Sequence, residues 1–277
     1  MLLVRLDSRD SSASKFQLMN HPTTLGERLT ARLRRAARFL SHTPLHPQWF
    51  SFNAKRRAFN EVRGLARGEV LDIGCGEGSL REALARHCYY TGLDSVATGQ
   101  ALYFASPDVY ADAAWLPFRT GAFDTVALLD VLEHLPEPDR ALGEIARTLA
   151  PGGRLLIHVP CMYPLHDEPY DYQRWTEHGL KLLLRRAGLQ PLVIEPLGAP
   201  TETAALMLNI AVSASLMKMI RRFPPCLVFA VLLAPLVLAS NIAGWLLGTA
   251  SRGDSLMPVS YWLVAVPAVT ARLNAAT

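Results

Sequence analysis

Cysteine is scarce in this chain: there are four among 277 residues, and they are scattered. No CxxC pair occurs, and no cysteine spacing is typical of a metal centre. This argues against a disulfide framework and against a zinc site, and it favours a reducing compartment. The sequence therefore predicts no bound metal.

Features of secreted and repetitive proteins are also missing. Residues 1–15 contain no long apolar segment and no small-residue cleavage site, so they do not resemble a signal peptide. Residues 1–24 are polar and aperiodic, which predicts disorder. Half of the chain is hydrophobic, enough for a sizeable core. The mean hydropathy of +0.16 is high for a soluble enzyme and points to a membrane-seeking part.

Charge is distributed unevenly along the chain, although the formal net charge is only +4. Residues 1–60 contain eleven Lys and Arg against three Asp and Glu. Residues 61–195 contain twelve against nineteen, and residues 196–277 contain five against two. An acidic middle with basic ends predicts that the ends face a polyanion or an anionic membrane.

From residue 69 onward, short apolar runs alternate with helical patterns. This alternation predicts an α/β fold with a parallel sheet covered by helices on both faces. Helices are predicted over 137–149 and 176–187, the second capped by Thr176. The predicted strands are 69–73, 89–94, 109–111, 125–130, 154–159, 190–197 and 259–266.

Three glycines alternate directly after the first predicted strand, in the stretch VLDIGCGEGSL. They are Gly74, Gly76 and Gly78. A strand that runs through glycines into a helix brings backbone N–H groups close to a ligand. The dinucleotide fingerprint needs a third glycine or alanine where this chain has serine. Asp94 ends the next strand, where a carboxylate can accept both hydroxyls of a ribose, so the pattern indicates a nucleoside and fits NAD as well.

Four segments, in order and at normal spacing, resemble the class I S-adenosylmethionine-dependent methyltransferases. They are LDIGCGEG, the strand end at Asp94, the segment ADA around Asp112, and DVLEH from Asp130 to His134. The resemblance runs from about residue 69 to 197 and resumes near the C-terminus. It implies a Rossmann-like, doubly wound, mostly parallel seven-stranded sheet, with S-adenosyl-L-methionine as cofactor.

The resemblance also implies which residues bind that cofactor. In this family the glycine loop approaches the methionine part of the cofactor, and an acid at the position of Asp72 lies near its ammonium group. The implied cofactor-binding residues are Asp72, Gly74, Cys75, Gly76, Gly78, Asp94, Ser95, Asp112, Ala113, Asp130 and Val131.

Three histidines fall where an acceptor would bind: His134 after the fourth strand, His158 within the fifth, and His166 in the following loop. Each could be a hydrogen-bonded histidine beside the pocket, or the general base that takes a proton from a hydroxyl acceptor. His134 and His166 are the stronger candidates, because open α/β sheets bind ligands beyond the carboxyl ends of their strands.

The loop at residues 160–176 is rich in charged and aromatic residues and contains the pattern HxxPxDxxR, from His166 to Arg174. Similar methyltransferases, often in settings of cell-surface glycan or lipid synthesis, carry such a loop. It could be a lid held by its own hydrogen bonds, or an acceptor pocket in which Asp171 or Arg174 orients a polar substrate. The predicted catalytic residues are His134, His166, Asp171 and Arg174.

The segment LGERLTARLRRAARFL, residues 25–40, places apolar residues three or four apart, with arginines on the remaining face. This pattern predicts an amphipathic basic helix. The helix could pack on the domain with solvated arginines, or it could lie on anionic lipid. A nucleic-acid arm is a third option, which nothing downstream supports, so no nucleic-acid partner is predicted.

An apolar insert separates the last two predicted strands, and Phe223 to Ser251 contains 29 residues without a charge. That length could cross a bilayer. A buried helical hairpin or a dimer interface is the alternative. Because the last two strands pair with each other in the resembling family, both ends of the insert must lie on one side. The insert therefore crosses a membrane twice or not at all.

Two crossings are disfavoured by the charges and prolines of the insert. They would carry a basic cluster, Lys218 with Arg221 and Arg222, to the far side, against the positive-inside rule. Pro235 and the pair at 224–225 would break helices that had to span. The sequence predicts instead a hairpin that dips into the cytoplasmic leaflet.

The predicted organisation and function follow. The predicted parts are a disordered N-terminus (1–24), a basic helical lead-in (25–60), a methyltransferase domain (61–200 with 255–270), and a membrane-associating insert (201–254). The protein is expected to methylate, on oxygen, a lipophilic or lipid-linked acceptor such as a glycolipid or polyprenyl-linked sugar, at the cytoplasmic face of the inner or plasma membrane. Two alternatives stay open: a quinone-precursor methyltransferase, and a catalytically inactive, cofactor-binding accessory protein of a membrane assembly.

Overall fold

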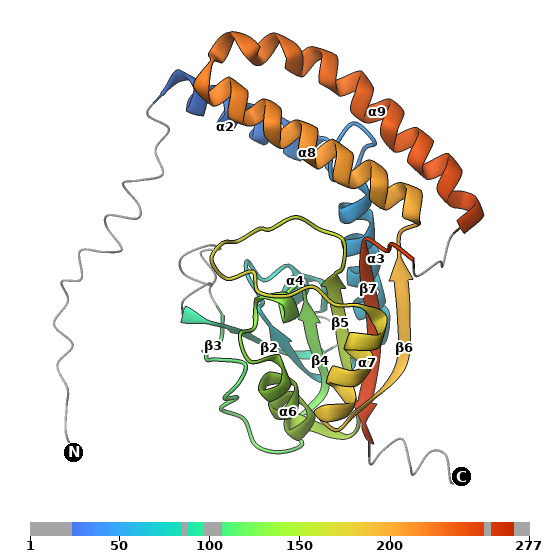
Figure 1. Cartoon of the computed structure of the whole chain (residues 1–277). Coiled ribbons are helices and arrows are strands. Elements are labelled where there is room, and N and C mark those ends of the chain that lie inside the picture. The colour runs from blue at the N-terminus through green and yellow to red at the C-terminus, as the bar shows by residue number, and fades with distance from the viewer. Residues whose placement is uncertain (1–23, 85–87, 97–106, 252–255, 269–277) are drawn as a thin grey trace, which may run out of the picture.

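The structure, a computed structural model, describes residues 24–84, 88–96, 107–251 and 256–268. Nearly all of the segment predicted to be disordered, residues 1–24, lies outside these ranges. Seven strands form one sheet in the order β3-β2-β1-β4-β5-β7-β6 (Figure 1). They are β1 (Gly68–Ile73), β2 (Cys88–Asp94), β3 (Val109–Tyr110), β4 (Phe123–Leu129), β5 (Leu149–Pro160), β6 (Leu189–Leu197) and β7 (Ser260–Pro267).

The strand directions confirm the predicted fold class. Neighbouring strands from β1 to β5 are parallel, and β7 pairs antiparallel with both β5 and β6. Each predicted strand is present. The ends agree within two residues except in β5, which begins at Leu149 and not at 154 as predicted. Because β6 and β7 pair, both ends of the insert between them lie at the same edge of the sheet.

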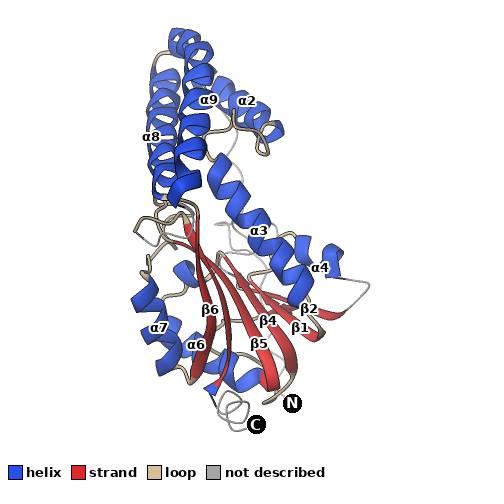
Figure 2. Cartoon of the chain, turned by 90° about the vertical axis from the view of Figure 1, so that its right-hand side faces the viewer, coloured by secondary structure: helices blue, strands red, loops and turns tan. Residues whose placement is uncertain are grey.

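The helices cover both faces of the sheet, with α3 and α4 on one side and α6 and α7 on the other (Figure 2). Thr176 caps α7 as predicted, since its hydroxyl accepts the Gly179 N–H. The helices are α2 (Leu25–Phe39), α3 (Trp49–Leu65), α4 (Ser79–Leu84), α6 (Pro138–Thr148), α7 (Glu177–Arg186), α8 (Pro200–Arg222) and α9 (Val228–Gly248), with 3₁₀ turns η1 (Leu132–His134), η2 (Pro224–Leu227) and η3 (Thr249–Ser251).

The apolar sequence of β1 shows why the sheet is buried on both faces. Successive side chains of a strand point to opposite faces. Leu71 belongs to the apolar cluster that includes α6 and α7, whereas Val70 belongs to the cluster that includes α3 and α4. Both side chains are fully buried. A strand with helices on both sides needs this continuous apolar run.

Helices α8 and α9 form a hairpin that stands beyond the carboxyl ends of the parallel strands (Figure 1). The two helices approach closely at Gly244, where an added Cβ would lie 3.0 Å from both the Thr201 carbonyl oxygen and the Ala205 Cβ. The Thr201 hydroxyl also donates to the Gly244 carbonyl over 2.9 Å. Gly248 packs against Ala199 in the same way, one turn further on. Contacts between small residues four apart are typical of helix pairs in membranes.

Helix α2 packs along α8 and completes a three-helix unit, called here the platform (α2, α8 and α9). Gly26 of α2 lies directly against the backbone of Arg221, where a side chain would clash. Leu29 and Leu33 pack on a cluster that contains Leu216 and Ile220 of α8. The hairpin therefore covers the middle of the predicted apolar face, at Leu29 and Leu33, whereas Leu25 and Leu40 at its ends are exposed, as are the arginines.

A buried polar network ties the platform to the segment between α2 and α3. The Asn241 amide donates to the carbonyl of Pro44 over 2.7 Å and to that of His46 over 3.1 Å. The Asn209 amide donates to the Asn241 oxygen over 2.9 Å. Both asparagines are buried, and a buried amide must find such partners. The network fixes where the chain enters α3.

One expectation about the hairpin is wrong. Pro235 lies inside α9 without interrupting it. Proline has no N–H to donate, so one backbone hydrogen bond is lost there, and the ring lies on the exposed side of the helix. By length and composition, Pro200–Arg222 and Pro224–Ser251 could each cross a membrane. Helix breaking by proline therefore gives no reason against two crossings.

Candidate active site

A cavity of about 460 Å³ opens at the carboxyl ends of β1, β2 and β4. Its volume lies in the range of small-molecule sites. Eight of the predicted cofactor-binding residues line it: Gly74, Gly76, Asp94, Ser95, Asp112, Ala113, Asp130 and Val131. The topology thus brings together residues from four separate segments of the sequence.

The glycine loop needs its glycines for two different reasons. Gly74, Gly76 and Gly78 all have positive φ, at 73°, 51° and 79°. A side chain at Gly74 would collide with Val131, whereas a Cβ at Gly76 would meet no protein atom within 4 Å and would extend into open space. Gly78 does not line this cavity. Its positive φ accounts for glycine in the turn.

Asp94 locks the loop to the end of β2. One of its carboxylate oxygens accepts the Gly76 N–H over 3.0 Å, and the other accepts the Ser95 N–H over 2.8 Å. The residue is buried, at 4% exposure. An ionised carboxylate has about four lone-pair sites, so each oxygen can still accept a hydroxyl from a ligand.

Asp72 does not line the large cavity. It lines a second cavity of about 280 Å³, together with Cys75. Gly74 and Asp130 line both cavities, so the two are adjacent. The Tyr90 hydroxyl donates to the Asp72 carboxylate over 2.6 Å. Burial raises the pKa of Asp72 to about 7, in spite of that hydrogen bond.

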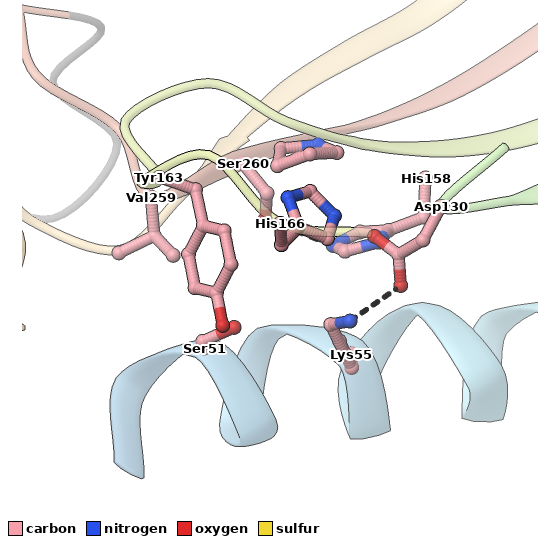
Figure 3. A pocket seen from close by; sticks show the side chains of 9 residues that line it. Ser51, Lys55, Asp130, His158, Tyr163, His166, Val259 and Ser260 are labelled. Carbon is pink, nitrogen blue, oxygen red and sulfur yellow. Dashed lines mark hydrogen bonds and ion pairs between the residues drawn. The ribbon is translucent and has the colours of Figure 1, made fainter. Parts of the chain in front are cut away.

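Asp130 joins three parts of the chain at the floor of these cavities. One carboxylate oxygen accepts from Lys55 of α3 over 3.0 Å, and the other bonds His158 Nδ1 over 2.8 Å (Figure 3). His158 Nε2 in turn bonds the Ser260 hydroxyl over 2.9 Å. Burial opposes ionisation of Asp130, but the charges and hydrogen bonds of Lys55 and His158 together outweigh it and hold the pKa of Asp130 well below its usual range.

Asp130 is therefore engaged by protein groups at both oxygens. His158 is buried and bonds both Asp130 and Ser260. Of the two roles considered for each histidine, it therefore has that of a hydrogen-bonded residue beside the pocket and not that of a general base.

Glu133, His134 and His166 form a separate cluster at the other side of the cavity. His134 lines the cavity, and its Nδ1 bonds the Tyr170 carbonyl over 2.9 Å. His166 lies against it with ring centroids 4.9 Å apart. Glu133 is fully buried, and burial raises the pKa of its carboxyl well above the usual value. Burial also lowers the pKa of His166.

A third, smaller cavity is lined by Lys55, Asp130, His158 and His166. Asp171 and Arg174, predicted to orient a substrate, line none of the three cavities. Their side chains pair through two hydrogen bonds of 2.6 and 2.7 Å. The Arg174 side chain also donates to the carbonyls of Tyr163 and Pro164. Asp171 accepts the His166 N–H, and these bonds hold its pKa at about 2 although burial opposes ionisation. The pair thus holds the loop around His166.

Comparison with known proteins places this site in a family. The “Methyltransferase domain” family matches residues 71–157. Over 178 residues the chain is 34% identical to the ubiquinone biosynthesis O-methyltransferase of Xanthomonas euvesicatoria, a match that covers 53% of this chain and 72% of that protein. The chain belongs to the class I S-adenosylmethionine-dependent methyltransferases.

Two further relatives differ in the name of their substrate. The ubiquinone biosynthesis O-methyltransferase of Paracidovorax citrulli is 31% identical over 139 residues, covering 42% of this chain and 58% of that protein. The 27-O-demethylrifamycin SV methyltransferase of Amycolatopsis mediterranei is 37% identical over 154 residues, and the match covers 46% of this chain and 55% of that protein. In several cases this methyltransferase spans only about half the length of the curated relatives it matches, as little as 47%.

S-adenosylmethionine is the cofactor of the family, and the residues present fit it. The open space in front of Gly76 leaves room for a ligand against the backbone. We propose that Asp94 accepts the ribose hydroxyls with its remaining lone pairs, and that Asp72, in the adjacent cavity, receives the ammonium group. In the same proposal Asp112, whose carboxylate accepts the Ala114 N–H over 2.9 Å, would lie on the adenine side.

Sequence reasoning missed two residues of this site. Lys55 lines all three cavities, but it comes from the lead-in, where no motif marks it. Glu133 stands beside His134 in the segment DVLEH, and an acid next to a candidate base just beyond a strand was a signal that could have identified it.

Substituting Gly76 and Asp94 tests the cofactor site. Gly76→Val should abolish cofactor binding, because its side chain would fill the open space and strain a backbone of positive φ. Asp94→Ala should weaken binding by about 1.5–3 kcal/mol, the loss of a charged acceptor. Isothermal calorimetry with S-adenosylmethionine measures both. Gly143→Val on α6, where a Cβ also meets nothing within 4 Å, is the matched control and should bind normally. Unchanged affinity in both site variants would contradict the assignment.

The raised pKa of Asp72 predicts a pH-dependent affinity. Because the pKa of Asp72 is about 7, its carboxyl is protonated in the free protein at lower pH. It must then lose its proton to pair with an ammonium group. Affinity should therefore rise from about pH 6 to about pH 7.5 and level off above the pKa. Asp72→Asn should bind more weakly with a flat profile, and Asp139→Asn, on the exposed surface of α6, should keep the wild-type profile. A flat wild-type profile would exclude this role.

Proposed function

We propose that this methyltransferase methylates a hydroxyl oxygen of a lipid-tailed acceptor at the cytoplasmic face of the membrane. The observation that carries the proposal is the position of the platform, which stands beyond the same strand ends at which the cofactor cavity opens (Figure 1). An acceptor whose tail stays in the bilayer could then present its head group to the cavity.

The surface of the platform supports a membrane partner. Helix α9 buries only a narrow stripe, Val237, Asn241, Gly244 and Gly248, against its neighbours. The rest of the helix exposes large apolar side chains, which soluble monomers seldom gather in such a number. They include Val228, Phe229, Val231, Leu232, Leu236, Trp245, Leu246 and Leu247.

The packing of α2 on α8 favours a platform that lies on the membrane over one that crosses it. If α8 crossed, α2 would enter the bilayer with it, since Gly26 lies against Arg221. A charged side chain at the centre of a bilayer costs about 2.5–3.5 kcal/mol on insertion scales. On the surface, the exposed arginines of α2 would gain about 1 kcal/mol each near anionic lipid. In this proposal residues 201–254 are the membrane-associating insert, and 61–200 with 255–270 form the methyltransferase domain.

The side chains around the cavity would supply positioning and proton removal. When bound, S-adenosylmethionine supplies a methyl group on a sulfonium leaving group. Because His134 Nδ1 bonds the Tyr170 carbonyl, the Nε2 lone pair is left to accept the proton of the acceptor hydroxyl. Asp171 holds His166 by accepting its backbone N–H, and the His166 ring lies against that of His134 and keeps it in position for this proton transfer. Lys55 stays charged, since Asp130 raises its pKa, and it can attract a developing oxyanion.

The names of the relatives favour oxygen as the acceptor atom. They also favour a second candidate, a phenolic hydroxyl of a quinone precursor, because two of the relatives are named for ubiquinone biosynthesis. Quinone precursors and polyprenyl-linked sugars both carry long apolar tails, so both suit a site next to the membrane. The acidity of the acceptor hydroxyl separates them.

Turnover on membrane lipids tests the function. Purified protein should transfer labelled methyl from S-adenosylmethionine into a lipid extract of cells that lack the protein, and mass spectrometry should identify the product as a phenol ether or a sugar ether. His134→Gln should lower turnover by about 10²–10⁴ with cofactor affinity retained. His178→Gln, on the exposed face of α7, is the control. Labelling of water-soluble metabolites alone would refute the lipid-tailed acceptor.

Membrane attachment should resist salt and leave nothing exposed outside. Salt screens the arginines of α2 but not buried apolar area, so detergent and not salt should release the protein. Cysteines at Arg222 and Thr249, in a background without the native cysteines, should stay unlabelled by an impermeant thiol reagent in intact cells and react after lysis. Labelling at position 222 from outside would establish two crossings. Full release by salt would contradict membrane burial.

A further inference from the structure

The carboxylate of Glu133 is buried without a hydrogen-bond partner. Its side chain is 0% exposed, and neither carboxylate oxygen has a hydrogen-bond partner within the described part of the chain. Buried polar side chains in native proteins are almost always bonded. An orphaned carboxylate next to His134, which lines the large cavity, therefore calls for a ligand that it can hold.

Two imidazoles converge on that carboxylate. His134 Nε2 lies 3.8 Å from Glu133 Oε1, and His166 Nε2 lies 3.9 Å from the same oxygen. These distances are too long for hydrogen bonds. One ligand atom from each of the three residues lies within 4.8 Å of the others. With metal–ligand bonds of about 2.0–2.2 Å, three donors around one ion stand about 3–3.5 Å apart, so a shift of roughly an ångström would close the set.

The second ring nitrogen of each histidine, Nδ1, already has a partner within the protein. His134 Nδ1 bonds the Tyr170 carbonyl over 2.9 Å, and His166 Nδ1 lies 3.1 Å from the Asp171 carboxylate. These partners orient the rings and favour the tautomer with a lone pair on Nε2. Metal-binding histidines almost always have such a carbonyl or carboxylate partner. The bonds from Arg174 to Asp171 and to the loop hold this arrangement in place.

We propose that Glu133, His134 and His166 bind a divalent transition-metal cation beside the cofactor cavity. Two imidazoles and one carboxylate are the ligand set of catalytic zinc sites that keep an open coordination position. The same set suits manganese or iron(II), whereas magnesium prefers oxygen ligands. The prediction of no metal came from the spacing of cysteines, and none of these ligands is a cysteine.

The cation's role deepens the proposed function and rests on it. Because His134 lines the cavity, the open position would face the acceptor, whose hydroxyl oxygen could complete the coordination. Binding to the cation lowers the pKa of that hydroxyl, so its proton leaves to solvent. The oxygen then forms the bond to the methyl carbon while the carbon–sulfur bond breaks and S-adenosylhomocysteine leaves. The cation would thus take over the proton-removing role assigned above to the His134 imidazole, whose Nε2 it occupies.

Metal binding can be measured without cofactor or acceptor. The full-length protein in detergent is stripped with a chelator, dialysed, and titrated with Zn²⁺ by calorimetry, with Mn²⁺ and Mg²⁺ in parallel. Visible absorption with Co²⁺ reports nitrogen and oxygen ligands. One Zn²⁺ per chain is expected, with Mg²⁺ much weaker. Glu133→Gln, His134→Gln and His166→Gln should each weaken Zn²⁺ binding by at least about 10–100-fold, and His178→Gln should not.

Retained S-adenosylmethionine affinity shows that each variant is folded. No Zn²⁺ binding by the wild type, or equal binding in all three variants, would overturn the site, and an ordered water would then fill the gap. For the role in transfer, the stripped protein should lose turnover with unchanged cofactor affinity and regain it with Zn²⁺ or Mn²⁺. Full turnover of the stripped protein would overturn that role and leave the methyltransferase assignment intact.

Discussion

The carboxylate of Asp130 holds together the three parts of the chain that form the site. Asp130 directly follows β4, and its carboxylate binds Lys55 from the lead-in helix α3 and His158 from β5. Its φ of 54° is uncommon for a residue other than glycine, so the backbone takes an unfavourable conformation to aim this side chain. The bonds from Lys55 and His158 to its two carboxylate oxygens offset the energy of this unfavourable backbone conformation. This contact fixes the Lys55 side chain against the floor of the cavity.

Helix α3 connects the site to the platform. At its start, the Asn241 amide holds the carbonyls of Pro44 and His46. Along its length, α3 packs on the sheet through Phe50, Ala54 and Ala58 and brings Lys55 to Asp130. A short rigid segment therefore links the surface proposed to meet lipid with the place where the methyl group would be transferred. This link explains why the lead-in and the insert, far apart in sequence, form one unit.

Much of this fold was predictable from the sequence, because the strands are buried on both faces and read as short apolar runs between helices. The glycine loop and Asp94 were predictable for a related reason: positive φ and close backbone approach leave a mark that few residues satisfy. Lys55 left no such mark, since its role depends on how α3 crosses the sheet. Asp171 and Arg174 were recognised as a pattern, but only the folded loop shows that they bond each other.

The uninterrupted course of α9 through Pro235 could not be predicted either, since it depends on whether packing along α8 outweighs the cost of a proline inside a helix. Glu133 and His166 lie 33 positions apart, and only the folded loop at 160–176 brings them to one point.

The central claim, a methyl transfer from a soluble cofactor to an acceptor held in the membrane, is tested most directly by surface dilution. The lipid acceptor is presented in vesicles at a fixed bulk concentration while added inert lipid lowers its mole fraction in the bilayer. If the platform docks on the membrane and the cavity takes its acceptor from there, the rate should fall with the mole fraction. A rate that follows the bulk concentration alone, and that is equal for a tail-less acceptor without vesicles, would contradict the account.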